Sequence, residues 1–281
     1  MAASVSQGST ASLWVRRIVL VVLGLIWLVP VYLFLANAAK TTESYGISSV
    51  WAPEGIAGLW SNIADAWDRG RLSRGFLSTA VYALVAPLLA VVVGAAAGFA
   101  IVALRLRHGF VWFVVIFAST IFPLQMILMP LFLGYAETGL YDSRQGMILV
   151  YTAISVPFAA FVMRNFFSGI AHQVFEAAVV DGAGTWRIFW RIYLPMSMSA
   201  LVAVYILQAT LIWNDLLLGL TLAQSETTRP LMPALSAMQS TYGGSTMPTV
   251  LAGGLLVSIP TVALFLLTQR VFSRGLSLGQ F

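Results

Sequence analysis

The sequence contains no cysteine, so disulfide bonds, thiolate nucleophiles and cysteine-ligated metal sites are all excluded. Charged residues are also scarce: they make up 9% of the 281 residues, whereas hydrophobic residues make up 59%. Soluble domains carry roughly 25% charged residues, and a chain with far fewer cannot cover a surface that faces water. A soluble enzyme and a disordered chain are therefore excluded, and the composition predicts a protein with several membrane spans.

Lysine occurs once, at Lys40, and the chain has no Gly-x-x-x-x-Gly-Lys-Ser/Thr motif. Since such a loop cradles nucleotide phosphates, we expect this chain to bind no cofactor itself. Any ATP-driven activity needs ATP and Mg on a separate subunit. The histidines His108 and His172 have no partner at metal-ligand spacing, so no metal site is predicted. An integral membrane enzyme would need a cluster of catalytic His, Asp or Glu residues, and no such cluster is apparent.

Apolar segments of about 20 residues are long enough to cross a bilayer as helices. We predict an all-α integral membrane protein with six such spans, at residues 18–39, 76–104, 110–133, 147–163, 198–222 and 249–272. Pro123 and Pro130 interrupt the third span and are expected to kink it. A cleaved secretory signal competes with the first span, because Ala36-Asn37-Ala38 resembles a cleavage site, but its apolar run exceeds the usual 7–15 residues.

Two shorter patterns add detail to this bundle. Leu59, Trp60, Ile63 and Trp67 recur at helical spacing, which predicts a short helix that either lies at the membrane interface or packs as part of a loop. In the second span, a stripe of small residues at Ala90, Gly94 and Gly98 predicts close approach to another helix.

The distribution of charge predicts the orientation. Cytoplasmic loops of membrane proteins carry an excess of Lys and Arg, and this excess falls on one side if both termini are cytoplasmic. That arrangement predicts a cytoplasmic tail at residues 1–15, a six-span membrane domain at 16–272 and a second cytoplasmic tail at 273–281. Arg71 and Arg74 on the outer side run against the rule. The basic residues on the predicted inner side are Arg16, Arg17, Arg105, Arg107, Arg164, Arg187, Arg191, Arg270 and Arg274.

The predicted cytoplasmic loop at residues 164–197 reads as two short helices with a bend. The first covers 172–181, Gly182 and Gly184 can adopt the positive φ that ends a helix, and Thr185 can cap the second. Ile188, Phe189 and Ile192 form an apolar face, and Pro195 ends this helix or begins the next span. Two interpretations stay open: the helix pair inserts into a groove on a partner, or it lies on lipid with Arg187 and Arg191 facing phosphates.

The same loop resembles the EAA loop of ABC-importer permeases, because three clusters fall in its order and spacing. They are Glu176-Ala177-Ala178, Asp181-Gly182-Ala183 and Ile192-x-Leu194-Pro195. Further segments resemble the carbohydrate-type permeases, in the branch of the smaller maltose-type subunit: Gly139–Asp142, Pro157-Phe158, Arg164–Phe167, Trp213–Asp215 and Arg274–Leu276. The chain departs from this pattern at Ser78-Thr79, where the family often has Asn-Ser, and in its last five residues.

The resemblance implies a six-span permease that forms half of a translocation pathway for a sugar or oligosaccharide in a bacterial cell membrane. Its implied partners are a second related permease, two copies of an ABC ATPase and an extracytoplasmic solute-binding protein. The alternative solute is a non-sugar such as a glycerophosphodiester. The residues implied to dock the ATPase, as a coupling helix, are Glu176, Ala177, Ala178, Asp181, Gly182, Ala183 and Arg187.

Polar residues in the fifth span suggest where a solute could pass. Tyr205, Gln208 and Asp215 fall on one helical face, with Asn214 beside it. Aromatic rings stack on sugars and amides bond their hydroxyls, so these four residues, with Gln125 in the third span, are candidates for lining the path. The alternative is that they hydrogen-bond between helices and hold the bundle together.

Overall fold

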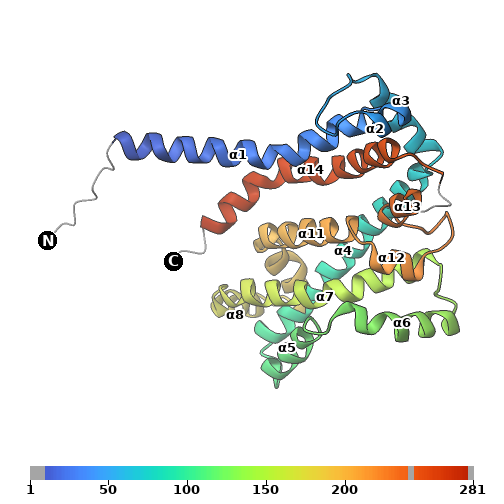
Figure 1. The fold of residues 1–281 in the computed structure, drawn as a ribbon. Helices are drawn as coiled ribbons and strands as arrows, with labels where there is room; N and C mark the ends of the chain where they lie inside the picture. Colours follow the sequence, from blue (N-terminus) through green and yellow to red (C-terminus); the bar gives the residue numbers. More distant parts are fainter. Residues whose placement is uncertain (1–9, 240–243, 278–281) are drawn as a thin grey trace. The chain divides into compact units, whose positions relative to one another are not determined.

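A computed structural model describes residues 10–239 and 244–277, and every regular element in these ranges is a helix (Figure 1). Four helices are long and apolar enough to cross a membrane: Leu13–Ala38, Leu72–Val102, Arg144–Ser168 and Met247–Gln269. A fifth candidate is a bent pair, Thr185–Met196 with Met198–Trp213, whose halves meet at 77°. The described residues therefore contain fewer unbroken spans than the six that we predicted.

The chain folds as two compact units, of which the first combines the residues up to 70 with 238–256. It contains α1 (Thr10–Ala38), α2 (Thr42–Ile47), α3 (Ala57–Asp68) and the beginning of α14 (Met247–Ser277). The predicted helix around Trp60 is α3, and its buried residues are Asn62 and Ala66, while Trp60 is exposed.

Asn62 holds this unit together. Its Nδ2 donates to the carbonyl oxygens of Ala38 (3.0 Å) and Lys40 (2.8 Å), and its Oδ1 accepts a hydrogen bond from Thr249. Lys40 is fully buried and its Nζ donates to the carbonyl oxygen of Ser49. Buried polar groups need such partners, so these bonds fix the turn that follows α1.

The second unit combines residues 71–237 with 257 onward. Its helices are α4 (Leu72–Val102), α5 (Gly109–Ala118), α6 (Leu124–Thr138), α7 (Arg144–Ser168), α8 (His172–Val180), α9 (Thr185–Ile188), the π-helical turn η1 (Phe189–Tyr193), α10 (Leu194–Met196), α11 (Met198–Trp213), α12 (Leu217–Leu222), α13 (Leu231–Met238) and the rest of α14. The helices α4 and α7 lie against each other at the centre of this unit (Figure 1).

The small-residue stripe of α4 makes the predicted close contact, and its partner is α7. A Cβ atom on Gly94 would lie 2.6 Å from the Cβ of Ala159, and one on Gly98 would lie 2.8 Å from the backbone nitrogen of Arg164. Ala90 is fully buried beside them. Glycine is required here because any side chain would hold the two backbones apart.

The interruption that we predicted in the third span is present at Pro123, where the span is divided into α5 and α6. The hydroxyl of Ser119 donates to the carbonyl of Ile116, and that of Thr120 donates to the carbonyl of Phe117, each at 2.7 Å. These bonds compete with the backbone hydrogen bonds of the helix. Pro123 then supplies no N–H and stands just before α6. Pro130, by contrast, lies inside α6 without ending it.

The fifth predicted span is wrong as a continuous helix, since α11 ends at Trp213 and α12 begins at Leu217. Asn214 donates from Nδ2 to the carbonyl of Thr210, and Asp215 accepts hydrogen bonds from the N–H groups of Leu218 and Gly219. Short polar side chains offer the backbone such local alternatives to a continuing helix. At the end of the chain, α14 runs to Ser277 and so takes in part of the predicted tail, whose residues 278–281 lie outside the described ranges.

Candidate functional site

The loop between α7 and α11 has the predicted form of two short helices. The first, α8, ends in a Schellman motif: the N–H of Ala183 donates to the carbonyl of Ala178, and that of Gly182 donates to the carbonyl of Val179. Gly182 has φ +77°, so the prediction of positive φ is confirmed there. It is wrong at Gly184, which has φ −69° and itself occupies the cap position that we assigned to Thr185.

The second helix of the loop runs through α9, η1 and α10 as far as Met196 and then turns sharply into α11. Ser197 forms the corner: its Oγ donates to the carbonyls of Tyr193 (2.8 Å) and Leu194 (3.1 Å), and its side chain is fully buried. Pro195 therefore neither ends the helix nor begins the next span, since the break falls two residues later.

One face of this loop packs on the ends of α4 and α7. Ile188, Phe189 and Tyr193 are buried, and Phe99 of α4 lies 4.8 Å from the ring of Tyr193 and 5.3 Å from that of Phe189. Ile192 packs against the same cluster, so the predicted apolar face is confirmed. Aromatic contacts of this kind fix the loop to the helices, which makes it a rigid projection.

Ala178 belongs to this buried face. It is 6% exposed and packs within the same chain, so its small side chain allows close packing of the loop on the rest of the second unit. The expectation that Ala178 offers a contact surface to a partner is therefore corrected.

The opposite face of the loop is open and combines charges with large apolar side chains. Val180 is 87% exposed and Trp186 is 70% exposed. Glu176, Ala177, Asp181, Gly182 and Arg187 are exposed on the same loop, and Ala183 is half-buried. The sequence analysis did not single out Val180 and Trp186. The sequence feature that could have identified them is that each is a large apolar residue next to polar residues of the motif.

A cavity of about 380 Å³ opens between α7 and α11. Its polar lining comprises Thr120, Tyr151, Ser155, Gln208 and Asp215, and its apolar lining comprises Leu124, Ile154, Phe158, Leu211 and Ile212. The Ser155 hydroxyl is buried and has no hydrogen-bond partner. A buried hydroxyl without a partner is a rare and costly feature.

Asp215 has structural bonds as well as a place in the cavity wall. Its Oδ2 accepts hydrogen bonds from the hydroxyl of Tyr151 at 2.9 Å and from the N–H of Gly219 at 3.1 Å. The alternative reading from the sequence, that this residue ties helices together, therefore holds for Asp215, which also faces the cavity.

The other candidate lining residues do not share this cavity. Tyr205 lines a separate apolar crevice and donates from its hydroxyl to the carbonyl of Leu84. Asn214 is exposed and bonds Thr210, while Gln125 is exposed at the beginning of α6. The predicted common face of Tyr205, Gln208 and Asp215 is thus corrected to Gln208 and Asp215.

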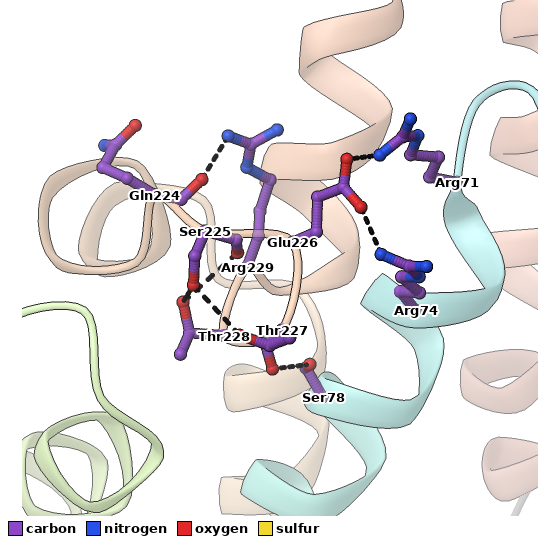
Figure 2. Close-up of polar contacts among 9 residues, drawn as sticks. All are labelled: Arg71, Arg74, Ser78, Gln224, Ser225, Glu226, Thr227, Thr228 and Arg229. Carbon is purple, nitrogen blue, oxygen red and sulfur yellow. Dashed lines mark hydrogen bonds and ion pairs between the residues drawn. The ribbon is translucent and has the colours of Figure 1, made fainter.

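At the other end of α4 and α7, the segment 224–231 is fastened by polar contacts (Figure 2). Glu226 forms ion pairs with Arg71 and Arg74, and the hydroxyl of Ser78 donates to the carbonyl of Thr227 at 3.1 Å. These two arginines, which the predicted orientation places against the positive-inside rule, thus have a carboxylate partner. Thr79 accepts a hydrogen bond from the N–H of Leu231 at 2.7 Å, so both residues of the atypical Ser78-Thr79 pair serve this attachment.

Asp142 holds the same segment from the turn before α7. Its carboxylate accepts hydrogen bonds from the N–H groups of Gln224 (2.8 Å) and Ser225 (3.0 Å) and from the hydroxyl of Thr228. Burial alone would raise the pKa of Asp142, but these hydrogen bonds outweigh burial and lower its pKa below the ordinary value of 3.8.

Comparison with known proteins agrees with this geometry. Residues 90–277 match the family described as binding-protein-dependent transport system inner membrane component. The chain is 28% identical over 274 residues to the diacetylchitobiose uptake system permease protein NgcG of Streptomyces coelicolor, covering 95% of this chain and 88% of that one. It is 30% identical over 270 residues to the sn-glycerol-3-phosphate transport system permease protein UgpE of Yersinia pestis, covering 92% and 94%.

A third relative is the melibiose/raffinose/stachyose import permease protein MelC of Bacillus subtilis, 27% identical over 253 residues that cover 89% of this chain and 90% of that one. Among solved structures, a chain of a bacterial ABC transporter involved in the import of the acidic polysaccharide alginate superimposes with a TM-score of 0.80. That match has 22% identity and covers 96% of this chain and 99% of the other, so it shows a shared fold.

The family match and the permease relatives identify this all-helical bundle as a membrane permease, which is a transporter subunit and not an enzyme. The chain belongs to the family of binding-protein-dependent transport system inner membrane components, and it is a multi-pass protein of the cell membrane.

Proposed function

We propose that this chain forms half of the translocation pathway of an ATP-driven importer for a sugar or oligosaccharide. The observation that carries this proposal is the loop at 164–197, whose buried face is fixed to α4 and α7 while its other face presents Val180 and Trp186. If the helix pair lay on lipid, its apolar side chains would point into the membrane, on the side where the loop is attached. Here apolar and charged side chains project together, which suits a protein groove.

The rigid base of the loop explains how a partner's movement reaches the membrane. Phe99 lies on α4, and Phe167 on α7 packs 5.4 Å from Tyr193. A displacement of the loop therefore carries both helix ends with it, because a packed core transmits strain. The partner that moves it is an ABC ATPase, which binds the ATP and Mg that this chain has no motif to hold.

The full assembly contains a second related permease, two ATPase copies and an extracytoplasmic solute-binding protein. We assign six crossings with cytoplasmic termini, the third made of α5 with α6 and the fifth of α11 with α12. This arrangement is supported by the grouping of the connections: the α4–α5 turn and the 164–197 loop adjoin one end of the α4–α7 pair, and Asp142 and the 224–231 segment adjoin the other.

The cavity between α7 and α11 is the proposed position for solute contact, with Gln208 and Ser155 as hydrogen-bonding groups. Among its lining residues the one acidic group is Asp215, and no Arg or Lys is present. A neutral sugar suits this wall better than a glycerophosphodiester, whose phosphate would meet a carboxylate. The names of NgcG and MelC, which refer to oligosaccharides, support the same choice, whereas the name of UgpE supports the alternative.

Docking is tested by Val180→Asp and Glu176→Lys, each made in the full transporter. Both should reduce co-purification of the ATPase and sugar uptake about tenfold or more, since each removes or reverses a group at the contact. The matched control is Ile47→Asp, which introduces the same charge at a position with 89% exposure outside this loop. If both loop variants keep the ATPase and transport normally, the assigned docking face is wrong.

Solute contact is tested by Gln208→Leu, which conserves the size of the side chain and removes its amide. We expect uptake to fall about fivefold, as for one lost hydrogen bond, while the ATPase still co-purifies. The control is Asn214→Ala, outside the cavity on the same helix end. Equal uptake by both variants would remove Gln208 from the path, and a greater loss for glycerol phosphate than for sugar would favour the alternative solute.

A further inference from the structure

A second polar cavity, of about 420 Å³, lies where α4 turns into α5 beside the end of α7. Its polar lining is Arg105, Arg164 and Ser168. The close contact at Gly98 brings α7 against the last turns of α4. The turn itself is tight, with the N–H of Leu106 donating to the carbonyl of Ala100 and Arg105 at φ +47°.

The two arginines in this cavity are not neutralised. Among the residues that the structure describes, no ion pair involves Arg105 or Arg164. The Nε of Arg164 is buried without a hydrogen-bond partner. Its guanidinium lies 5.0 Å from the ring centre of Phe113, and one terminal nitrogen donates to Asn165 Oδ1 at 3.2 Å.

A buried guanidinium N–H without an acceptor is costly unless a ligand supplies one. The ring of Phe113 attracts the positive charge of the Arg164 guanidinium, but it does not accept hydrogen bonds from the N–H groups that lie in the guanidinium plane. The missing partner is therefore an anion with several oxygen atoms, and the planar donors of arginine match phosphate in particular.

The rim of the cavity identifies the source of that phosphate. Leu106 and Phe110, which line the cavity beside the two arginines, are exposed large apolar residues, Phe110 at 71%. Apolar side chains beside a basic pocket at the end of membrane helices suit a molecule with acyl chains and an anionic head. We propose that this cavity binds the phosphate group of an anionic phospholipid, in the leaflet that faces the 164–197 loop.

The test uses the full chain purified with its transporter partners in detergent. Phosphatidylglycerol and phosphatidylcholine are titrated separately, and bound lipid is counted by native mass spectrometry. We expect the wild type to prefer phosphatidylglycerol, and Arg105→Gln and Arg164→Gln each to weaken that binding about fivefold. Phosphatidylcholine binding should not change in either variant.

The matched control is Arg107→Gln, which removes an arginine from the same turn but not from the cavity lining. Arg105 lies on an exposed turn, so its variant tests the site even if Arg164→Gln fails to fold. Equal binding of the two lipids, or unchanged binding in Arg105→Gln, would overturn the proposal. Displacement of phosphatidylglycerol by an equal concentration of inorganic phosphate would also overturn it, because the site would then hold the free ion.

Discussion

Asp215 illustrates how one polar residue inside a bundle can have two roles. An ionisable residue in a membrane segment is a functional candidate by default, and Asp215 does line the cavity between α7 and α11. Its carboxylate also receives the hydroxyl of Tyr151 and the N–H of Gly219. These bonds orient it and help to begin α12, so its loss would affect both the cavity and the helix break.

Asp142 gives a pH-dependent prediction at the same scale. Its pKa is lower in the folded chain than the ordinary 3.8, so its stabilisation is fully present above that value and is lost as the pH falls through the folded pKa. Near neutral pH, Asp142→Ala should lower the free energy of unfolding by about 1 to 2 kcal/mol, a hydrogen-bond estimate reduced for partial exposure. Below pH 3.8 the difference from the wild type should shrink.

Thermal unfolding of the purified transporter at both pH values measures this difference. The control is Glu137→Ala, which removes an exposed carboxylate from the end of α6 and should leave stability unchanged. A difference between Asp142→Ala and wild type that stays constant as the pH is lowered would show that the carboxylate charge does not contribute.

At the scale of elements, the α4–α7 pair is the base to which the functional loop is attached. Its contact depends on backbones that approach at Gly94 and Gly98, and Phe99, which packs against the loop, is the next residue along α4. Whatever separates α4 from α7 therefore also disturbs the attachment of the 164–197 loop.

Gly94→Ala tests that dependence. An added Cβ would lie 2.7 Å from the backbone nitrogen of Ala160, which cannot move without shifting the helix, so we expect a loss of about 1 to 3 kcal/mol in the free energy of unfolding. Gly134→Ala in α6 is the control, because its Cβ would meet nothing within 4 Å. That change should be neutral or stabilising by up to about 1 kcal/mol. Thermal unfolding of both variants decides, and equal stability would contradict tight packing at Gly94.

At the scale of the whole molecule, the proposed topology assigns the connections to two sides of the membrane. The basic turn at Arg105 and the 164–197 loop belong to the inner set, whereas Asp142 and the ion pairs of Glu226 belong to the outer set. Glu226 pairs with Arg71 and Arg74, but the positive-inside rule counts Lys and Arg and not net charge, so these two arginines still run against it in the proposed topology.

The absence of cysteine makes this topology directly measurable. Val180→Cys and Ile47→Cys place single thiols at positions with similar exposure, 87% and 89%. In intact cells a membrane-impermeant maleimide should label only the thiol at position 47, and after permeabilisation it should label both. Labelling of position 180 in intact cells would reverse the orientation and exclude contact of this loop with a cytoplasmic ATPase.

Several features could be predicted from local sequence because their causes are local. Apolar runs are long enough to form membrane helices, the stripe at Gly94 and Gly98 has helical spacing, and Gly182 occupies a position where only glycine adopts positive φ without strain. The apolar face of Ile188 and Phe189 follows from the same periodicity. In each case a few neighbouring residues carry enough free energy to fix the outcome.

The tertiary structure decided what depends on residues far apart in the chain. Helical spacing placed Tyr205 with Gln208, but the backbone of α4 takes the hydroxyl of Tyr205 away from the cavity. Ala178 reads as a contact residue in its motif and is buried because Phe99 and Phe167 lie behind it. At the break before Leu217, Asp215 binds the nearby N–H of Gly219 and also the hydroxyl of Tyr151, which is 64 positions away in the chain. Sequence therefore determined the type of protein, and packing between distant segments determined which side chains line a cavity, lie exposed or are buried in the core.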